Sequence, residues 1–201
     1  MIIYGNEQGE LMYAPVAAYL EKYSDSTVVW DAVSTRIGWA VVFCGKEGVV
    51  AVRLARDVSI AVAEILKESN RIGLIRVGGE GSPIMPVMEL VAGMVEGIDS
   101  DVLLPLDVQG TEFQCDVWEV VRGIPKGATM TYGDVAKEMG SPDAARAVGS
   151  ACAANSIALV IPCHRVIPSG DSAGVSGYRW GWEAKRHLLD AEGAFSSKVT
   201  A

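Results

Sequence analysis

The sequence predicts an α+β protein in which a small N-terminal lobe of strands and helices precedes a mainly helical C-terminal lobe with a helix-turn-helix. Residues 28–104 alternate short apolar runs with amphipathic stretches, whereas residues 105–193 place apolar side chains mostly at helical spacing. Two short helices joined by a tight turn are expected within residues 131–154. Half of the 201 residues are hydrophobic, which is enough to bury a core in one domain or in two packed lobes.

The first lobe follows from its apolar runs and from one capping residue. Residues 1–27 are expected to be an N-terminal extension with a weak helix at 14–22, and residues 194–201 a C-terminal tail. Asp57 is a predicted N-cap for a helix through residue 67, with Ala61, Ile65 and Leu66 facing inward. The remaining predicted elements are strands at 28–30, 39–43, 49–52 and 72–77, a helix at 83–96 and an extended piece at 102–106.

The second lobe begins with a more regular pattern. Phe113, Val117, Val120 and Val121 recur at helical spacing, and the turn-rich residues 123–127 end that helix. The next helix has a start resembling a capping box, because Thr131 is followed three residues later by Asp134, and Gly140 can end it. These two helices lead into the segment with the most unusual composition.

A further helix is predicted to run through residue 154, capped by Ser141 and with Pro142 at its first position. Nearly all of its side chains are Ala, Gly or Ser, and Arg146 is the one large polar side chain in its middle. Such a thin face can pack closely in a protein core. It also suits a helix that lies in a narrow groove of DNA and inserts one side chain into the base stack, and Arg146 favours this second interpretation.

Cys163 is the residue of greatest chemical interest, because it stands between an apolar run and the pair His164 and Arg165. A free thiol has a pKa of about 8.5, so a cysteine that attacks carbon needs a neighbouring base or positive charge. His164 or Arg165 could supply either, and the chain has only two histidines. The alternative is that Cys163 is simply a small core residue.

Composition excludes several classes of protein. No apolar run reaches about 18 residues, and the start of the chain does not resemble a signal peptide, so we expect a cytoplasmic protein without a membrane partner. The four cysteines show no CxxC spacing, and with two histidines no metal site is expected. The net charge of -8 argues against general affinity for nucleic acid, since phosphate contacts need Lys and Arg.

Several motifs taken in order resemble the O6-alkylguanine-DNA alkyltransferases, and within that family the carboxy-terminal repair half of the bacterial Ada protein. The resemblance covers residues 107–192 strongly, and the order of elements in 28–104 is similar to the family's ribonuclease H-like N-terminal lobe. The residues that carry it are Tyr132, Arg146-Ala147-Val148, Asn155, Pro162-Cys163-His164-Arg165-Val166, Ser176-Gly177-Tyr178-Arg179-Trp180-Gly181, Lys185, Leu188-Leu189 and Glu192.

The resemblance implies a monomeric repair protein that needs no cofactor and acts on double-stranded DNA containing O6-alkylguanine. Residues 105–193 would be the DNA-binding and catalytic domain. The damaged nucleotide would be flipped out of the duplex, and its alkyl group would pass irreversibly and stoichiometrically to Cys163. A hydrogen-bonded chain from Glu192 through His164 and water would activate that thiol. Asn155 would hold the active-site segment in place, and Tyr132 would rotate the phosphate and donate to guanine N3.

The remaining roles implied by the resemblance concern DNA and the damaged base. Arg146 would enter the gap left by the flipped nucleotide, and Tyr178 would form a wall of the guanine pocket. The implied DNA-binding residues are Arg146, Tyr132, Ala145, Gly149 and Ser150, and the implied pocket residues are Cys163, Val166, Tyr178 and Arg179, the last through main-chain groups.

Some features leave alternatives open. Asn155-Ser156 stands where many members have Asn-Pro, Ala158 replaces a proline of some relatives, and the loop at 166–177 is longer than in close relatives, so tolerance of bulky adducts is an open question. Glu192 could instead be a solvated residue at a helix end, and Lys185-Arg186 an exposed basic face. Competing functions are a non-catalytic alkylguanine-DNA sensor, a cysteine hydrolase and a plain helix-turn-helix regulator.

Overall fold

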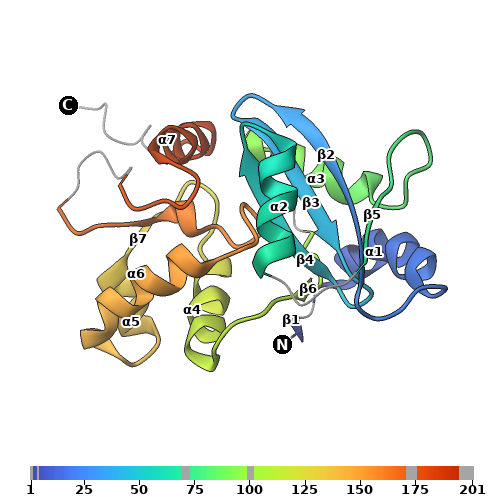
Figure 1. The fold of residues 1–201 in the computed structure, drawn as a ribbon. Coiled ribbons are helices and arrows are strands. Elements are labelled where there is room, and N and C mark those ends of the chain that lie inside the picture. Colours follow the sequence, from blue (N-terminus) through green and yellow to red (C-terminus); the bar gives the residue numbers. More distant parts are fainter. Residues whose placement is uncertain (1, 4, 69–72, 99–101, 171–175, 195–201) are drawn as a thin grey trace.

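The N-terminal lobe is built on a six-stranded sheet, shown in Figure 1 for the computed structural model, which describes residues 2–3, 5–68, 73–98, 102–170 and 176–194. The spatial order of the strands is β1-β6-β4-β3-β2-β5, with β2, β3 and β4 antiparallel and the β2–β5 and β4–β6 pairs parallel. The strands are β1 (Ile2–Ile3), β2 (Thr27–Thr35), β3 (Gly38–Cys44), β4 (Val49–Ala55), β5 (Gly73–Arg76) and β6 (Leu106–Asp107). The predicted α+β class is confirmed.

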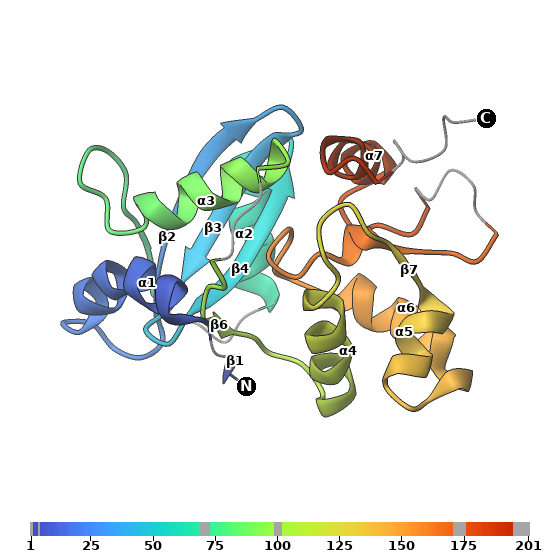
Figure 2. The same ribbon diagram turned by 180° about the vertical axis from the view of Figure 1, so that it is seen from behind.

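Helices cover both faces of this sheet, as the two opposite views in Figures 1 and 2 show. Helix α2 (Val58–Glu68) lies on one face, where Ala61 and Ile65 pack with Val41 and Phe43 of β3. Helices α1 (Glu7–Leu20) and α3 (Met85–Val95) lie on the other face. Side chains that point to either face of β2, β3 and β4 are therefore buried under helices. This explains why these strands are nearly continuous apolar runs.

Three predictions for this lobe need correction. The N-terminal helix spans Glu7–Leu20 instead of 14–22, because the Asn6 side chain accepts a hydrogen bond from the Gly9 amide and caps it. Leu66 is 54% exposed, since it lies on the solvent side of α2. The extended piece expected at 102–106 forms a strand only at β6, because the described pairings of that segment begin at Leu106.

The C-terminal lobe is mainly helical, as predicted. Its α4 and α5 begin at capping boxes, Thr111 with Gln114 and Thr131 with Asp134, and Gly140 follows α5 in a left-handed conformation with φ of 71°. Its elements are α4 (Glu112–Arg122), β7 (Met130–Thr131), α5 (Tyr132–Glu138), the 3-10 turn η1 (Pro142–Ala144), α6 (Ala145–Ala154), the 3-10 turn η2 (Cys163–Arg165), β8 (Val166–Ile167) and α7 (Trp182–Ala191).

The predicted cap at Ser141 is wrong. Residues 142–144 form the separate turn η1, so α6 begins only at Ala145 and the Ser141 side chain makes no capping hydrogen bond. The Ser141 amide instead donates to the Ala136 carbonyl and closes the end of α5. Part of the 166–177 loop, residues 171–175, and nearly all of the expected tail at 194–201 lie outside the described residues. Across the described ranges, no helix combines the length and apolar character needed to cross a membrane.

The two lobes are joined by a short extension of the sheet. The Val52 amide of β4 donates to the Ser156 carbonyl, and the Ala158 amide donates to the Val52 carbonyl, at 3.1 and 3.0 Å. These bonds form a parallel bridge between Val52 and Ile157. The chain segment that leaves α6 is therefore hydrogen-bonded to the edge of β4 like a further strand.

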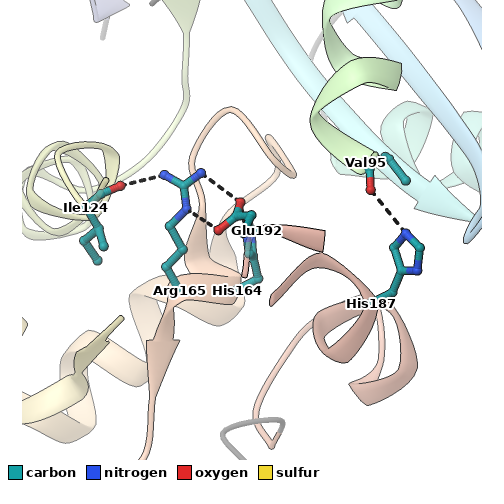
Figure 3. Close-up of polar contacts among 6 residues, drawn as sticks. All are labelled: Val95, Ile124, His164, Arg165, His187 and Glu192. Carbon is teal, nitrogen blue, oxygen red and sulfur yellow. Dashed lines mark hydrogen bonds and ion pairs between the residues drawn. The ribbon is translucent and has the colours of Figure 1, made fainter. Parts of the chain in front are cut away.

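Helix α7 also rests on the N-terminal lobe, at the C-terminal end of α3. The His187 Nε2 atom lies 3.2 Å from the Val95 carbonyl oxygen, and Figure 3 shows this contact. Gly97 approaches so closely that a Cβ atom there would lie 2.3 Å from the Ala191 carbonyl oxygen. Gly97 also has φ of 67°, so both its conformation and its contact require glycine.

We expect Gly97→Ala to destabilise the protein by about 2 kcal/mol, because the methyl group must displace main-chain atoms of α7 and the residue must keep a left-handed conformation. Gly93→Ala is the matched control, since its Cβ would meet only the Ile98 side chain at 3.6 Å. That helical substitution should be neutral or stabilising by up to about 1 kcal/mol. Urea unfolding checks both values, and equal stability of the two variants would contradict the close-approach explanation.

Candidate active site

Cys163 lies at the start of η2, in the segment that Val52 ties to the sheet. Its side chain is buried, with 3% of its surface exposed. The preceding turn is tight: the Ile161 amide donates to the Ile157 carbonyl, and the Cys163 amide to the Ile161 carbonyl, at 3.1 and 2.8 Å. Within it, Leu159 has φ of 69°, a left-handed conformation that costs roughly 1–2 kcal/mol for a residue with a side chain. The surrounding hydrogen bonds hold the chain in this strained turn.

Asn155 ties both ends of this turn together. Its Oδ1 accepts from the Ile157 amide at 2.8 Å, and its Nδ2 donates to the Ile161 carbonyl at 2.9 Å. The same Nδ2 atom lies 3.2 Å from Cys163 Sγ and donates to it. Because Asn155 is fully buried and all of these bonds are made, its amide fixes the position of the sulfur.

Cys163 is a protonated thiol at neutral pH. Its contact with the Cys152 thiol, together with burial, raises the pKa of Cys163 well above its ordinary value, against smaller opposing effects of Asn155 and Lys185. A thiol in this state cannot act as a nucleophile until a base removes its proton. The interpretation of Cys163 as a plain core residue therefore depends on whether a base is present.

His164 is suited to be that base. Burial lowers the pKa of His164 below its ordinary value of 6.5, against the opposing effect of Glu192, so the ring is neutral at pH 7. Its Nε2 lies 2.8 Å from Glu192 Oε1, and a carboxylate can only accept, so Nε2 carries the ring proton. The Nδ1 atom is then an unprotonated acceptor. It is buried without a hydrogen-bond partner among the described residues, which suits a base that binds water or takes a proton.

Arg165 completes this network, and its role was not predicted from the sequence. Its Nε and Nη2 donate to the two Glu192 oxygens at 2.9 and 2.8 Å, and its Nη1 donates to the Ile124 carbonyl at 2.6 Å (Figure 3). Burial alone would raise the pKa of Glu192, but hydrogen bonds from His164 and Arg165 lower it from 4.5 to about 2. This pairing stabilises the fold above pH 4.5 and is lost as the pH falls towards 2. Glu192 is therefore not a solvated helix end.

Two tyrosines stand near this centre. Tyr178 contacts the His164 ring edge-on, with 6.2 Å between ring centroids, and its hydroxyl is buried without a partner among the described residues. The Tyr132 hydroxyl donates to the Gly177 carbonyl at 3.2 Å. Burial, with the nearby Cys152 and Cys163, raises the pKa of Tyr132 to about 12, so its hydroxyl stays protonated at neutral pH and can donate a hydrogen bond. Gly177 must be glycine, since a Cβ there would lie 2.9 Å from that hydroxyl.

Lys185 is fully buried, so the alternative of an exposed basic face is wrong for this residue and holds only for Arg186. Its Nζ donates to the Val166 and Ser176 carbonyls at 2.7 and 2.9 Å. It therefore joins the two ends of the 166–177 loop. Val166, one of the predicted pocket residues, is itself buried.

Four of the five predicted DNA-binding residues lie on α6, whereas Tyr132 begins α5. Arg146 is exposed on α6, with Ser150 one turn later and Ala145 and Gly149 partly exposed beside it. The opposite side of α6 is buried, and Trp118 Nε1 donates to the Ala151 carbonyl at 2.9 Å and fastens α6 to α4. The structure thus places two hydrogen-bonded groups side by side along the chain, Asn155 with Cys163 and His164 with Glu192, and leaves Arg146 on the outside.

Arg179 is the predicted pocket residue whose side chain points elsewhere. Its Nη2 donates to Glu68 Oε1 of the N-terminal lobe at 2.7 Å. No local pattern indicates this contact, because the two residues are 111 positions apart. Taken together, the arrangement provides a thiol, a neutral imidazole oriented by a carboxylate, and a protonated tyrosine, which can displace a leaving group from carbon without a metal.

Comparison with known proteins supplies the family context. A family model described as the DNA binding domain of 6-O-methylguanine DNA methyltransferase matches residues 112–194. The bifunctional transcriptional activator/DNA repair enzyme Ada of Escherichia coli is 49% identical over 106 residues, or 53% of this chain and 29% of Ada. The inducible methylated-DNA–protein-cysteine methyltransferase of Bacillus subtilis is 33% identical over 167 residues, or 72% of this chain and 89% of that protein.

Solved structures agree with these sequence relatives. The crystal structure of Mycobacterium tuberculosis OGT in complex with DNA matches with a TM-score of 0.65 and 32% identity, covering 83% of this chain and 94% of that one. The chain spans less than a third of the Ada proteins it matches, and most of the B. subtilis protein.

We expect the pKa of His164 to lie below 6.5 and to fall further in Glu192→Gln, because the carboxylate that favours the charged ring is removed while Arg165 remains. Titration of the histidine ring signals by NMR measures both values. The spectrum of His187→Gln identifies which signals belong to His164. A pKa at or above 6.5, or a rise in the variant, would contradict the neutral-base assignment.

Proposed function

The chain belongs to the 6-O-methylguanine DNA methyltransferase family, and from this premise we propose that it repairs O6-alkylguanine in double-stranded DNA by taking the alkyl group onto Cys163. It acts as a methylated-DNA–protein-cysteine S-methyltransferase that works once per molecule. The observation that carries the proposal is a pair of buried hydrogen bonds on adjacent residues. Asn155 donates to Cys163 Sγ, and the neutral His164 pairs with the ionised Glu192.

The proposed reaction is a displacement at carbon. His164 Nδ1, acting through a water molecule, removes the Cys163 proton, and the sulfur attacks the alkyl carbon. The new S–C bond forms as the O6–C bond breaks, and the electron pair of the broken bond moves into the guanine ring. The Tyr132 hydroxyl donates a hydrogen bond to N3 as this charge develops, and the proton that Cys163 gave up to His164 and water is returned through solvent, so that the base leaves as neutral guanine. The product thioether has no good leaving group, so the protein is consumed. General acid and base help of this kind contributes about 10²–10⁴-fold each.

The proposal assigns DNA binding to a helix-turn-helix made of α5, η1 and α6. Its thin outer face, with Ala145, Gly149 and Ser150, permits close approach to a groove, and Arg146 can fill the space left by a flipped nucleotide. The net charge of -8 fits a protein that gains specificity from the lesion and not from general phosphate attraction. Main-chain groups near Val166 and Arg179, beside the wall formed by Tyr178, read the base edge.

The proposal also covers the fold and organisation of the chain. A ribonuclease H-like N-terminal lobe is supported by three successive antiparallel strands, followed by a helix and a strand parallel to the first. We keep residues 28–104 and 105–193 as its two functional units. A monomeric state and a cytoplasmic location stay predictions.

The competing functions fit this site less well. A cysteine hydrolase works with a thiol whose pKa is lowered, whereas the pKa of Cys163 is raised. A non-catalytic sensor of alkylguanine has no need of a neutral histidine directly after a buried cysteine. A plain transcriptional regulator would need more base-reading side chains than α6 offers.

We expect a duplex with one O6-methylguanine to add one methyl group to each protein molecule, located on Cys163, because the thioether is stable. Intact-mass measurement followed by peptide mapping checks this result. Cys163→Ser should bind the duplex without repair, whereas Cys115→Ala, at a buried cysteine of α4 outside the network, should react normally. More than one turnover per molecule, or an adduct on another residue, would contradict the proposal.

Arg146→Ala should slow repair of duplex substrate by about 10-fold or more. Unstacking the nucleotide costs a few kcal/mol, and the variant lacks the side chain that would fill the vacated space in the DNA duplex. Repair of the free base O6-methylguanine should stay unchanged, since no flipping is needed. Arg186→Ala removes the same charge from the exposed side of α7 and serves as the control. Equal loss with duplex and free base would show that Arg146 does not act in nucleotide flipping.

A further inference from the structure

Three charged side chains connect the predicted guanine pocket with the interior of the N-terminal lobe. Glu68, the last residue of α2, accepts from Arg179 through Oε1 and pairs with Arg53 of β4 through Oε2. Arg179 follows Tyr178 directly, and Tyr178 contacts the His164 ring. The carboxylate of Glu68 therefore lies between the wall of the site and the central part of the sheet. We call this set the Arg53–Glu68–Arg179 bridge.

Arg53 is an unusual anchor, because its side chain is only 1% exposed. It stands opposite Val41 in the β3–β4 register, so it lies on the face that α2 covers. Its Nε and Nη1 atoms are buried without hydrogen-bond partners among the described residues. A buried guanidinium is costly unless it is paired, so Glu68 is held strongly towards β4. This leaves one carboxylate oxygen of fixed position for Arg179.

The bridge acts on a segment that the N-terminal lobe also holds elsewhere. Arg56, at the end of β4, lies 3.3 Å from Glu183 of α7, and His187 contacts the Val95 carbonyl. Those two contacts hold α7. The bridge is the contact beside the pocket wall, since Arg179 lies before α7 begins and next to Tyr178.

We propose that Glu68 is a positioning residue that sets substrate specificity: by holding Arg179, the bridge fixes the Tyr178 wall and limits the size of alkyl group that the pocket admits. This inference rests on the proposed alkyl-transfer function. A wall fixed from the N-terminal lobe fits a methyl group and excludes a bulky one such as benzyl. A wall released from Glu68 can move outward, so the penalty for a benzyl group falls while Cys163 and His164 keep their own hydrogen bonds.

An ordinary surface ion pair predicts something different. Glu68 is 43% exposed, and an exposed pair of this kind has little effect on stability. A merely structural role would change the melting temperature or slow both substrates equally. The ratio of benzyl to methyl transfer rates is the quantity that distinguishes a specificity role from a structural one.

The experiment measures single-turnover transfer rates from duplexes that carry O6-methylguanine or O6-benzylguanine. Glu68→Gln and Arg179→Met should each raise the benzyl-to-methyl ratio by about 3–10-fold. Arg179→Met keeps the Arg53–Glu68 pair, so it remains informative if Glu68→Gln is poorly folded. The double variant should show no larger effect than either single one, because both remove the same link. Glu68→Asp, which keeps the charge, should give a ratio nearer to the wild-type value.

Asp25→Asn is the control, because it removes an ion pair with Lys46 within the N-terminal lobe. It changes the net charge of the protein by the same amount as Glu68→Gln. Its ratio should equal that of the wild type. The inference would be overturned by a benzyl-to-methyl ratio within twofold of wild type in Arg179→Met, or by additive effects in the double variant. Normal methyl transfer in the same experiment would leave the proposed function intact. Failure of the wild type to take methyl from its duplex would overturn the proposed function, and this inference with it.

Discussion

The hydrogen bonds between Val52 and the segment 156–158 are the constraint on which the rest of the site depends. They hold the chain that leaves α6 against the edge of β4, so the strained turn at Leu159 is supported on both sides. Asn155 and Cys163 then have defined positions within that turn. A nucleophile that must meet a carbon atom in line gains from such rigidity, because misplacement by about 1 Å can cost 10²-fold in rate.

Charge is arranged around this rigid turn in a consistent way. Arg165 holds Glu192 ionised, Glu192 determines which nitrogen of His164 carries the proton, and burial keeps the ring neutral. The raised pKa of Cys163 keeps the thiol uncharged, and an uncharged thiol is stable in a buried site until its proton is removed. Arg165 is paired with Glu192, whereas Arg146 is exposed on α6.

Local features of the chain were predictable from sequence, and long-range contacts were not. The Thr131 and Asp134 capping box depends on residues three apart, and the strands of the first lobe depend on apolar runs, so both were predicted. Ser141 was mistaken for a cap because its sequence fits one equally well, although its amide closes the preceding helix. Lys185 could not be placed, since a buried lysine looks like an exposed one until the loop ends that it binds are known. Cys163 and His164 were singled out from the residues themselves, whereas Glu192 was added only through family resemblance.

The close approach of Gly97 to Ala191 has a bearing on how independent the second lobe can be. Glu192 follows Ala191 directly, and a Cβ on Gly127 would lie 3.1 Å from the Glu192 carbonyl oxygen, so main-chain surfaces of both lobes enclose this residue. The main chain that carries Glu192 is thus packed against two glycines, and one of them, Gly97, lies outside the segment that matches the family model. Transplanting residues 112–194 onto another scaffold would keep Cys163 and Glu192 but would remove the contact of Gly97 with Ala191, the residue before Glu192.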